Sequence, residues 1–115
     1  MDNKVKISIL LETYGKLLTQ KQFSLLDDYY NNDLSLSEIA ENEEITRQAV
    51  RDNLKKGENK LFEYEKKLGI MKKTVESQEK IAEVLSEITT IETKMTDKEI
   101  AEVLEDVKNK LSVLI

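Results

Sequence analysis

The chain has 115 residues and a net charge of −5, and it contains no proline, cysteine or histidine. The absence of cysteine excludes disulfides and thiolate chemistry, and the absence of histidine removes the commonest general base and transition-metal ligand. A proline-free chain with many Leu, Ile, Glu and Lys residues favours an all-α fold.

The first two predicted helices lie near residues 3–17 and 20–30. In both, apolar side chains recur every three or four residues, which indicates a buried stripe on one face of each helix. The polar run Asn31-Asn32-Asp33 tolerates turn conformations and ends the second helix. The side chains predicted to face inward are Ile7, Leu10, Leu11, Tyr14, Leu17, Leu18, Phe23, Leu26 and Tyr30.

A short third helix is predicted over about residues 36–42, and a long fourth helix over 47–68, with Gly69 as its C-terminal cap. The apolar residues of the long helix are spaced four-three-four-three-four, as in a coiled-coil seam. Because Gly57 sits in this seam, another helix can approach closely there. The full seam is Val50, Leu54, Gly57, Leu61, Tyr64 and Leu68, and the third helix is expected to bury Leu36, Ile39 and Ala40.

Two further amphipathic helices are predicted over residues 74–93 and 97–113, joined by a turn short enough to make them a hairpin. Residues 70–73 are the expected hinge. The predicted organisation is therefore a helix-turn-helix domain over 1–69 and a helical extension over 70–115. A two-helix hairpin cannot bury both of its apolar sides alone. We therefore expect it to pack on the first domain or on a second chain, and we favour a homodimer.

Four helix starts carry a capping residue that can accept the free N–H groups of the first turn, preceded by an apolar residue that packs four positions into the helix. Three of them also have Glu or Gln at the position that completes a capping box. The four predicted caps are Thr19, Ser35, Thr46 and Thr96.

The third helix, a three-residue turn and the capped fourth helix have the spacing of a helix-turn-helix. With Val50 at the centre of the buried side, ~100° per residue places a polar face outward. The second helix of this motif lies in the major groove with its N-terminal residues at the base edges. Residues 46–69 also form the only basic segment, with seven basic and four acidic side chains. The candidate nucleic-acid-binding residues are Arg47, Gln48, Arg51, Lys55 and Lys56.

Each candidate has a chemical role in this reading. Arginine can pair with guanine or phosphate, glutamine with adenine, and lysine with phosphate. The alternative is a solvated helix face with internal salt links, for example Arg51 to Glu58 or Lys55 to Asp52.

The same residues carry a resemblance. Segments 18–22 (LTQKQ), 36–40 (LSEIA) and 46–56 (TRQAVRDNLKK) resemble region 4 of bacterial sigma factors, and 61–68 (LFEYEKKL) resembles the small YlxM-like family more closely. The similarity covers about residues 1–70. It implies a sigma-like helix-turn-helix and a regulatory role linked, by gene neighbourhood, to the signal recognition particle pathway of protein targeting.

The sequence departs from this pattern at the turn. Glu43 and Glu44 stand where the family usually has an apolar residue followed by Gly or Asn, and a position with φ > 0 suits glutamate poorly. Acidic side chains near the approach to a duplex repel phosphates within a Debye length of ~8 Å. They are Glu38, Glu41, Glu43 and Glu44, with Asp52 on the outward face. This charge opposes specific binding to duplex DNA.

Three functions follow as hypotheses. The preferred one is a regulatory adaptor of the signal recognition particle system that binds nucleic acid through the helix-turn-helix. The alternatives are a DNA-binding transcriptional regulator and a purely protein-binding scaffold. No Gly-rich phosphate loop and no nucleophile–base set is present, so we expect neither an enzyme nor a cofactor or metal site. With no run of ~20 apolar residues and no signal-peptide core, a cytoplasmic location is expected.

Overall fold

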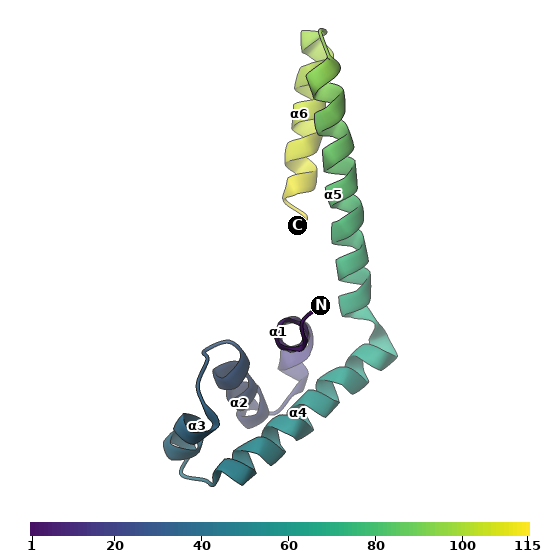
Figure 1. The fold of residues 1–115 in the computed structure, drawn as a ribbon. Coiled ribbons are helices and arrows are strands. Elements are labelled where there is room, and N and C mark those ends of the chain that lie inside the picture. The colour runs from purple at the N-terminus through teal and green to yellow at the C-terminus, as the bar shows by residue number, and fades with distance from the viewer. The chain divides into compact units, whose positions relative to one another are not determined.

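The computed structural model describes residues 1–115 and is all-α, which confirms the predicted fold class. The helices are α1 (Asn3–Tyr14), α2 (Gln20–Tyr30), α3 (Leu36–Glu43), α4 (Arg47–Leu68), α5 (Ile70–Lys94) and α6 (Lys98–Ser112), with a short 3₁₀ turn at Gly15–Leu17 (Figure 1). They form two compact units, Met1–Met71 and Lys72–Ile115. None of the helices combines the length and the apolar composition that a bilayer crossing requires.

In the first unit, α1, α2 and α3 all pack against the long helix α4 (Figure 1). The predicted seam of α4 is the part that meets them, because its side chains project at intervals of three and four onto one face. The largest fully buried side chains are Ile7, Leu10, Leu11, Tyr14, Leu25, Leu26, Ile39, Val50 and Leu61.

Gly57 brings α4 unusually close to α2. A Cβ atom added at Gly57 would lie 2.7 Å from Cδ1 of Leu26, which is itself fully buried. Real Cβ atoms do not make contacts this short, so a larger residue would force the two helices or the leucine to move. The close helix approach predicted at Gly57 is therefore present.

Four details of the predicted core are wrong. Leu68, the last residue of the predicted seam of α4, is 54% exposed. Leu17 is 57% exposed, because the 3₁₀ turn at residues 15–17 rotates it off the apolar stripe of α1. Leu25, which was not predicted to be inward, is buried. Phe23 is 38% exposed, and its ring lies over Gly15, where a Cβ would meet it at 2.7 Å.

The helix caps follow the sequence prediction with one exception. Thr19, Ser35 and Thr46 each accept a backbone N–H in the first turn of α2, α3 and α4. The prediction of Thr96 as the cap of α6 is wrong, because Asp97 takes this position and its carboxylate accepts from the N–H groups of Glu99 and Ile100. A carboxylate can serve two donors at once and is favoured by the positive end of the helix dipole.

The predicted start of the fifth helix at residue 74 is four residues too late, because the residues of the expected hinge, 70–73, form the first turn of α5. The break between α4 and α5 is the single residue Gly69, which adopts a left-handed conformation with φ 62°. Gly69 caps α4 as predicted, and glycine suits this conformation because it has no Cβ.

The start of α5 takes its hydrogen-bond acceptors from two distant side chains. The phenol oxygen of Tyr14 accepts from the N–H of Ile70 at 3.1 Å, and Glu65 Oε1 accepts from the N–H of Met71 at 3.0 Å. The Tyr14 hydroxyl in turn donates to Glu65 Oε1 at 2.6 Å. These bonds do for α5 what a capping residue does elsewhere. Burial and the bond to Glu65 raise the pKa of Tyr14.

A second phenol–carboxylate bond links α2 to α4. The Tyr30 hydroxyl donates to Glu58, which lies seven residues before Glu65 on the same face of α4. Burial and this bond raise the pKa of Tyr30 strongly. Each of the two bonds joins a tyrosine at the end of one packed helix to the partly buried edge of α4.

The second unit is an antiparallel hairpin of α5 and α6. Between the helices, Lys108 forms an ion pair with Glu92 at 3.4 Å. Glu105 hydrogen bonds to Glu92, and this contact and the negative charge of Glu92 raise the pKa of Glu105. Ile88 is the only buried apolar side chain of this unit, at 7% exposure, and α6 has none. The hairpin therefore leaves most of its apolar side chains open.

The turn between α3 and α4 contains the strained residue that the sequence suggested. Glu44 ends α3 in the left-handed region with φ 55° and ψ 42°. Its N–H donates to the carbonyl of Glu41, and the N–H of Ile45 donates to that of Ala40, so the turn closes despite the unfavourable residue. A left-handed conformation costs a residue with a Cβ roughly 1 kcal/mol.

Gly57→Ala should lower the free energy of unfolding by about 1 kcal/mol, although alanine is the better helix former, because overpacking at Leu26 outweighs the gain in propensity. With Leu26→Ala also present, the same change should be neutral or stabilising. Urea unfolding of the natural protein, the two single variants and the double variant, followed by circular dichroism, gives a double-mutant cycle for this contact. Strictly additive effects would show that α2 and α4 do not meet at this point.

Glu44→Gly should raise the free energy of unfolding by about 1 kcal/mol, because glycine adopts the left-handed conformation without strain. Glu43→Gly is the matched control. It removes the same charge one residue earlier, inside α3, where glycine should cost about 1 kcal/mol. Thermal unfolding of both variants measures the difference, and equal effects would rule out the backbone explanation.

The two tyrosine bonds predict a loss of stability in alkaline solution. The pKa of both groups is higher in the folded state than the ordinary value of 10.0, so their contribution is complete below pH 10 and disappears as the pH rises further. The double variant Tyr14→Phe, Tyr30→Phe should be less stable than the natural protein at pH 8. Urea unfolding at pH 8 and above pH 10 should show that the difference in free energy of unfolding between the two proteins becomes smaller at the higher pH. A difference that does not change with pH would contradict a role of tyrosine ionisation in stability.

Candidate nucleic-acid interface

The helix-turn-helix holds the start of α4 in a fixed geometry. Thr46 Oγ1 accepts from the N–H of Ala49 at 3.0 Å, and Val50, four residues into the helix, is fully buried. Ile39 and Ala40 of α3 are buried in the first unit as well. Side chains on the outward face of the first turns of α4 therefore project from a rigid support.

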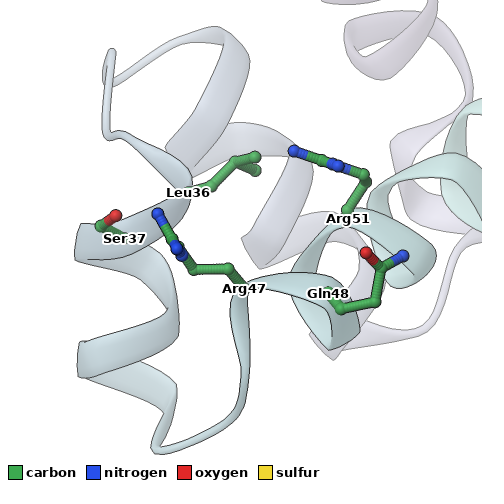
Figure 2. A pocket seen from close by; sticks show the side chains of 5 residues that line it. All are labelled: Leu36, Ser37, Arg47, Gln48 and Arg51. Atoms are coloured by element: carbon green, nitrogen blue, oxygen red, sulfur yellow. The ribbon is translucent and has the colours of Figure 1, made fainter.

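All five predicted site residues are exposed, and three of them line one groove. Arg47, Gln48 and Arg51 meet Leu36 and Ser37, from the first turn of α3, around a groove of about 570 Å³. Figure 2 shows the side chains of Arg47 and Arg51 extending toward the start of α3, whereas Gln48 points away from it. We call this surface the α3–α4 groove. Lys55 and Lys56 lie further along α4 and do not line it.

The cations of this surface form no internal ion pairs, so the alternative of internal salt links is not realised. The carboxylate expected to pair with Arg51, that of Glu58, accepts from Tyr30 instead. The carboxylate expected to pair with Lys55, that of Asp52, accepts from Gln48 Nε2 at 2.9 Å. The free cations are Arg47, Arg51, Lys55 and Lys56.

The bond between Gln48 and Asp52 changes what the site can do. A glutamine reads adenine by donating and accepting through its amide at the same time. Here one N–H of Gln48 is already used, and a negative charge lies beside it on the outward face. The arrangement is therefore better suited to contacts with phosphate groups, which need only cations and donors, than to reading bases.

The acidic residues near the turn stay outside the groove. Glu38 bends back to accept from the N–H of Ser35 at 3.3 Å, in the capping box of α3. No acidic side chain lines the α3–α4 groove. The acidic turn is therefore expected to repel phosphates only at the edge of the α3–α4 groove. The two arginines line the acid-free part of the groove.

Sequence reasoning missed the contribution of α3 to this surface. Leu36 was assigned to the core and Ser37 to no role, yet both line the groove. Their backbone N–H groups belong to the first turn of a helix, where such groups lack a partner within the helix. The capping box at Ser35 was the available signal, because it fixes where that turn begins.

Comparison with known proteins identifies the relatives of this chain. A family model described as a helix-turn-helix protein, YlxM / p13 like, matches residues 1–107. A UPF0122 protein of Acetivibrio thermocellus is 39% identical over 115 residues, covering 100% of this chain and 98% of its own length. A UPF0122 protein of Clostridium kluyveri is 46% identical over 111 residues, 95% of each chain.

Both the match over nearly the whole sequence and the capped α3–turn–α4 arrangement agree with the resemblance seen in the residues. The chain belongs to the YlxM / p13-like family of helix-turn-helix proteins.

Proposed function

We propose that this protein is a regulatory nucleic-acid-binding protein that holds a phosphate backbone against the exposed start of α4. The observation that carries the proposal is the pair Arg47 and Arg51. These side chains lie one helical turn apart, are free of ion pairs and flank an acid-free groove. Arginine binds phosphate through two parallel N–H donors, which makes such a pair a strong site for one or two backbone phosphates.

The first turn of α3 supports the same ligand. Ser37 lies in the groove beside the arginines, and the N-terminus of a helix presents partly positive N–H groups to an anion. Lys55 and Lys56 extend the positive surface along α4 and would contact the phosphates that follow. The ligand would therefore be held mainly by its backbone and recognised by its shape.

We propose further that the partner belongs to the signal recognition particle system and that the protein acts there as an adaptor in the cytoplasm, without catalysis. Support for this step comes from the family resemblance alone. A structured RNA fits the site well, because double-stranded RNA is recognised mainly through its shape and backbone.

A DNA-binding transcriptional regulator is the second candidate, and the α3–turn–α4 geometry favours it. A helix held in this way can enter a major groove with Arg47 at its leading end. The Gln48–Asp52 bond speaks against base-specific contacts, so this candidate requires Asp52 to release the amide when DNA binds.

The expected homodimer is part of the proposal. Two joined copies would present two α4 helices to one nucleic acid, and the second contact would benefit from a high effective concentration.

Arg47→Ala combined with Arg51→Ala should weaken binding to nucleic acid at least tenfold, because two charge-assisted contacts are lost. The slope of log K against log salt should fall by about 0.9 for each phosphate contact removed from a duplex. Fluorescence anisotropy with a labelled RNA hairpin and a labelled DNA duplex, over a range of salt, measures both quantities. Lys66→Ala with Lys67→Ala removes the same charge at the far end of α4 and should change affinity much less. Equal losses in the two variants would refute the site.

Asp52→Asn should strengthen binding by a few fold at low salt, since it removes a negative charge from the outward face and loosens the hold on Gln48. The gain should shrink as salt rises. If neither RNA nor DNA binds the natural protein in this assay, the protein-binding scaffold becomes the better explanation.

A further inference from the structure

The α5–α6 hairpin carries large apolar side chains that remain exposed. Val84 and Ile91 of α5 are 41% and 49% exposed, and the three on α6 together with Leu114, just after its end, are between 38% and 63% exposed. We call these six residues the hairpin apolar face; they are Val84, Ile91, Ile100, Val103, Val107 and Leu114.

The six residues lie on the same side of the hairpin. At ~100° per residue, Val84 and Ile91 are displaced by about 70° from the side of α5 that faces α6. The apolar residues of α6 are displaced in the same rotational sense from the side that faces α5. Because the two helices run in opposite directions, equal rotations bring both stripes to one surface.

The opposite surface is different in character. The same construction places exposed Ser, Thr, Asn, Gln and Glu side chains there, with Ala82 and the half-buried Val75 as the apolar residues. The exposed residues are Gln78, Ala82, Ser86 and Thr89 of α5 and Glu102, Glu105, Asn109 and Ser112 of α6. The hairpin is therefore amphipathic as a unit, which is the property of one half of a four-helix bundle.

The contacts of Glu92 fix the register of the two helices. Its bonds to Lys108 and Glu105 place residue 92 between residues 105 and 108 along the hairpin. Counting equally down both helices from there, Ile91 lies level with Val107, and Val84 lies level with Leu114, two turns further from the hairpin turn. The apolar face thus consists of ordered layers.

The charges at the two edges of this face complement each other. With the same register, Glu87 on the outer edge of α5 lies level with Lys110 on the outer edge of α6, within about 3 Å along the axis. Lys94 on α5 and Asp106 on α6 are level in the same way. When a second hairpin is placed face to face about a two-fold axis parallel to the helices, α5 of each copy meets α6 of the other. Both edge pairs then bring opposite charges together, and Lys110 and Asp106, which already pair with each other at 2.9 Å within α6, would be joined by Glu87 and Lys94 of the other copy.

We propose that the hairpin apolar face binds the same face of a second copy of this chain and forms a two-fold four-helix bundle. The first unit is a poorer occupant, because its large exposed apolar side chains, such as Val5, Leu17, Phe23 and Leu68, come from four different elements and not from one stripe along a pair of helices. A nucleic acid is excluded by the apolar character of the face. The inference rests on the hairpin and stands independently of what α4 binds.

Sedimentation equilibrium of the full chain at about 100 µM should show a dimer. Ile91→Glu with Val103→Glu should raise the dimer dissociation constant by more than a hundredfold, because four charges would enter an apolar interface. Thr89→Glu with Asn109→Glu adds the same charges to the opposite surface and should leave the dimer intact. Circular dichroism of both variants should report unchanged helix content, which separates dissociation from unfolding.

A charge exchange tests the two-fold arrangement itself. Glu87→Lys and Lys110→Glu should each weaken the dimer by about two- to fivefold, and the two together should restore it. A natural protein that stays monomeric, or a control variant that dissociates as much as the apolar-face variant, would overturn the proposal. Failure of the combined exchange to restore association would overturn the parallel two-fold axis.

Discussion

The close contact of α4 with α2 at Gly57 is the constraint on which the first unit depends. Leu26 fills the space that a side chain at Gly57 would occupy, and the buried residues of α1 and α3 pack along the same side of α4. Because this side of α4 is fixed, its opposite side is fixed as well. The orientation of Arg47 and Arg51 toward solvent is therefore linked to the packing around one glycine about two to three turns away.

Much of the fold could be predicted from local patterns. Caps at Thr19, Ser35 and Thr46 and the apolar periodicity between them depend on residues only a few positions apart, so the sequence displays them directly. The start of α5 could not be predicted in this way. Its N–H groups are bonded to Tyr14, which is 56 residues away, and to Glu65. No local capping signal marks residue 70 as a helix start, and the apolar periodicity predicted a start at residue 74.

The candidate site shows the same division. Helical periodicity was sufficient to bring Arg47, Gln48 and Arg51 to one exposed surface. It could not show that Gln48 would be engaged by Asp52, because the choice among Gln48, Lys55 and solvent as the partner of that carboxylate depends on side-chain conformation. It could not reveal the contribution of Ser37 either, since this requires the angle between two helices. A protein of net charge −5 can nevertheless present cations in an acid-free groove, because acids near it are held in the cap of α3, in the bond to Tyr30 or in the bond to Gln48.

The bonds that Tyr14 and Glu65 make to the first turn of α5 also bear on the order of assembly during synthesis. Starting a helix is the costly step, because several residues must be ordered before hydrogen bonds compensate for the loss of entropy. The acceptors for this turn are brought together only after α1 and α4 have met, and both precede α5 in the chain. The part of the protein that leaves the ribosome first thus provides a template for the helix that follows. Vectorial synthesis favours the completion of the first unit before the hairpin grows from it.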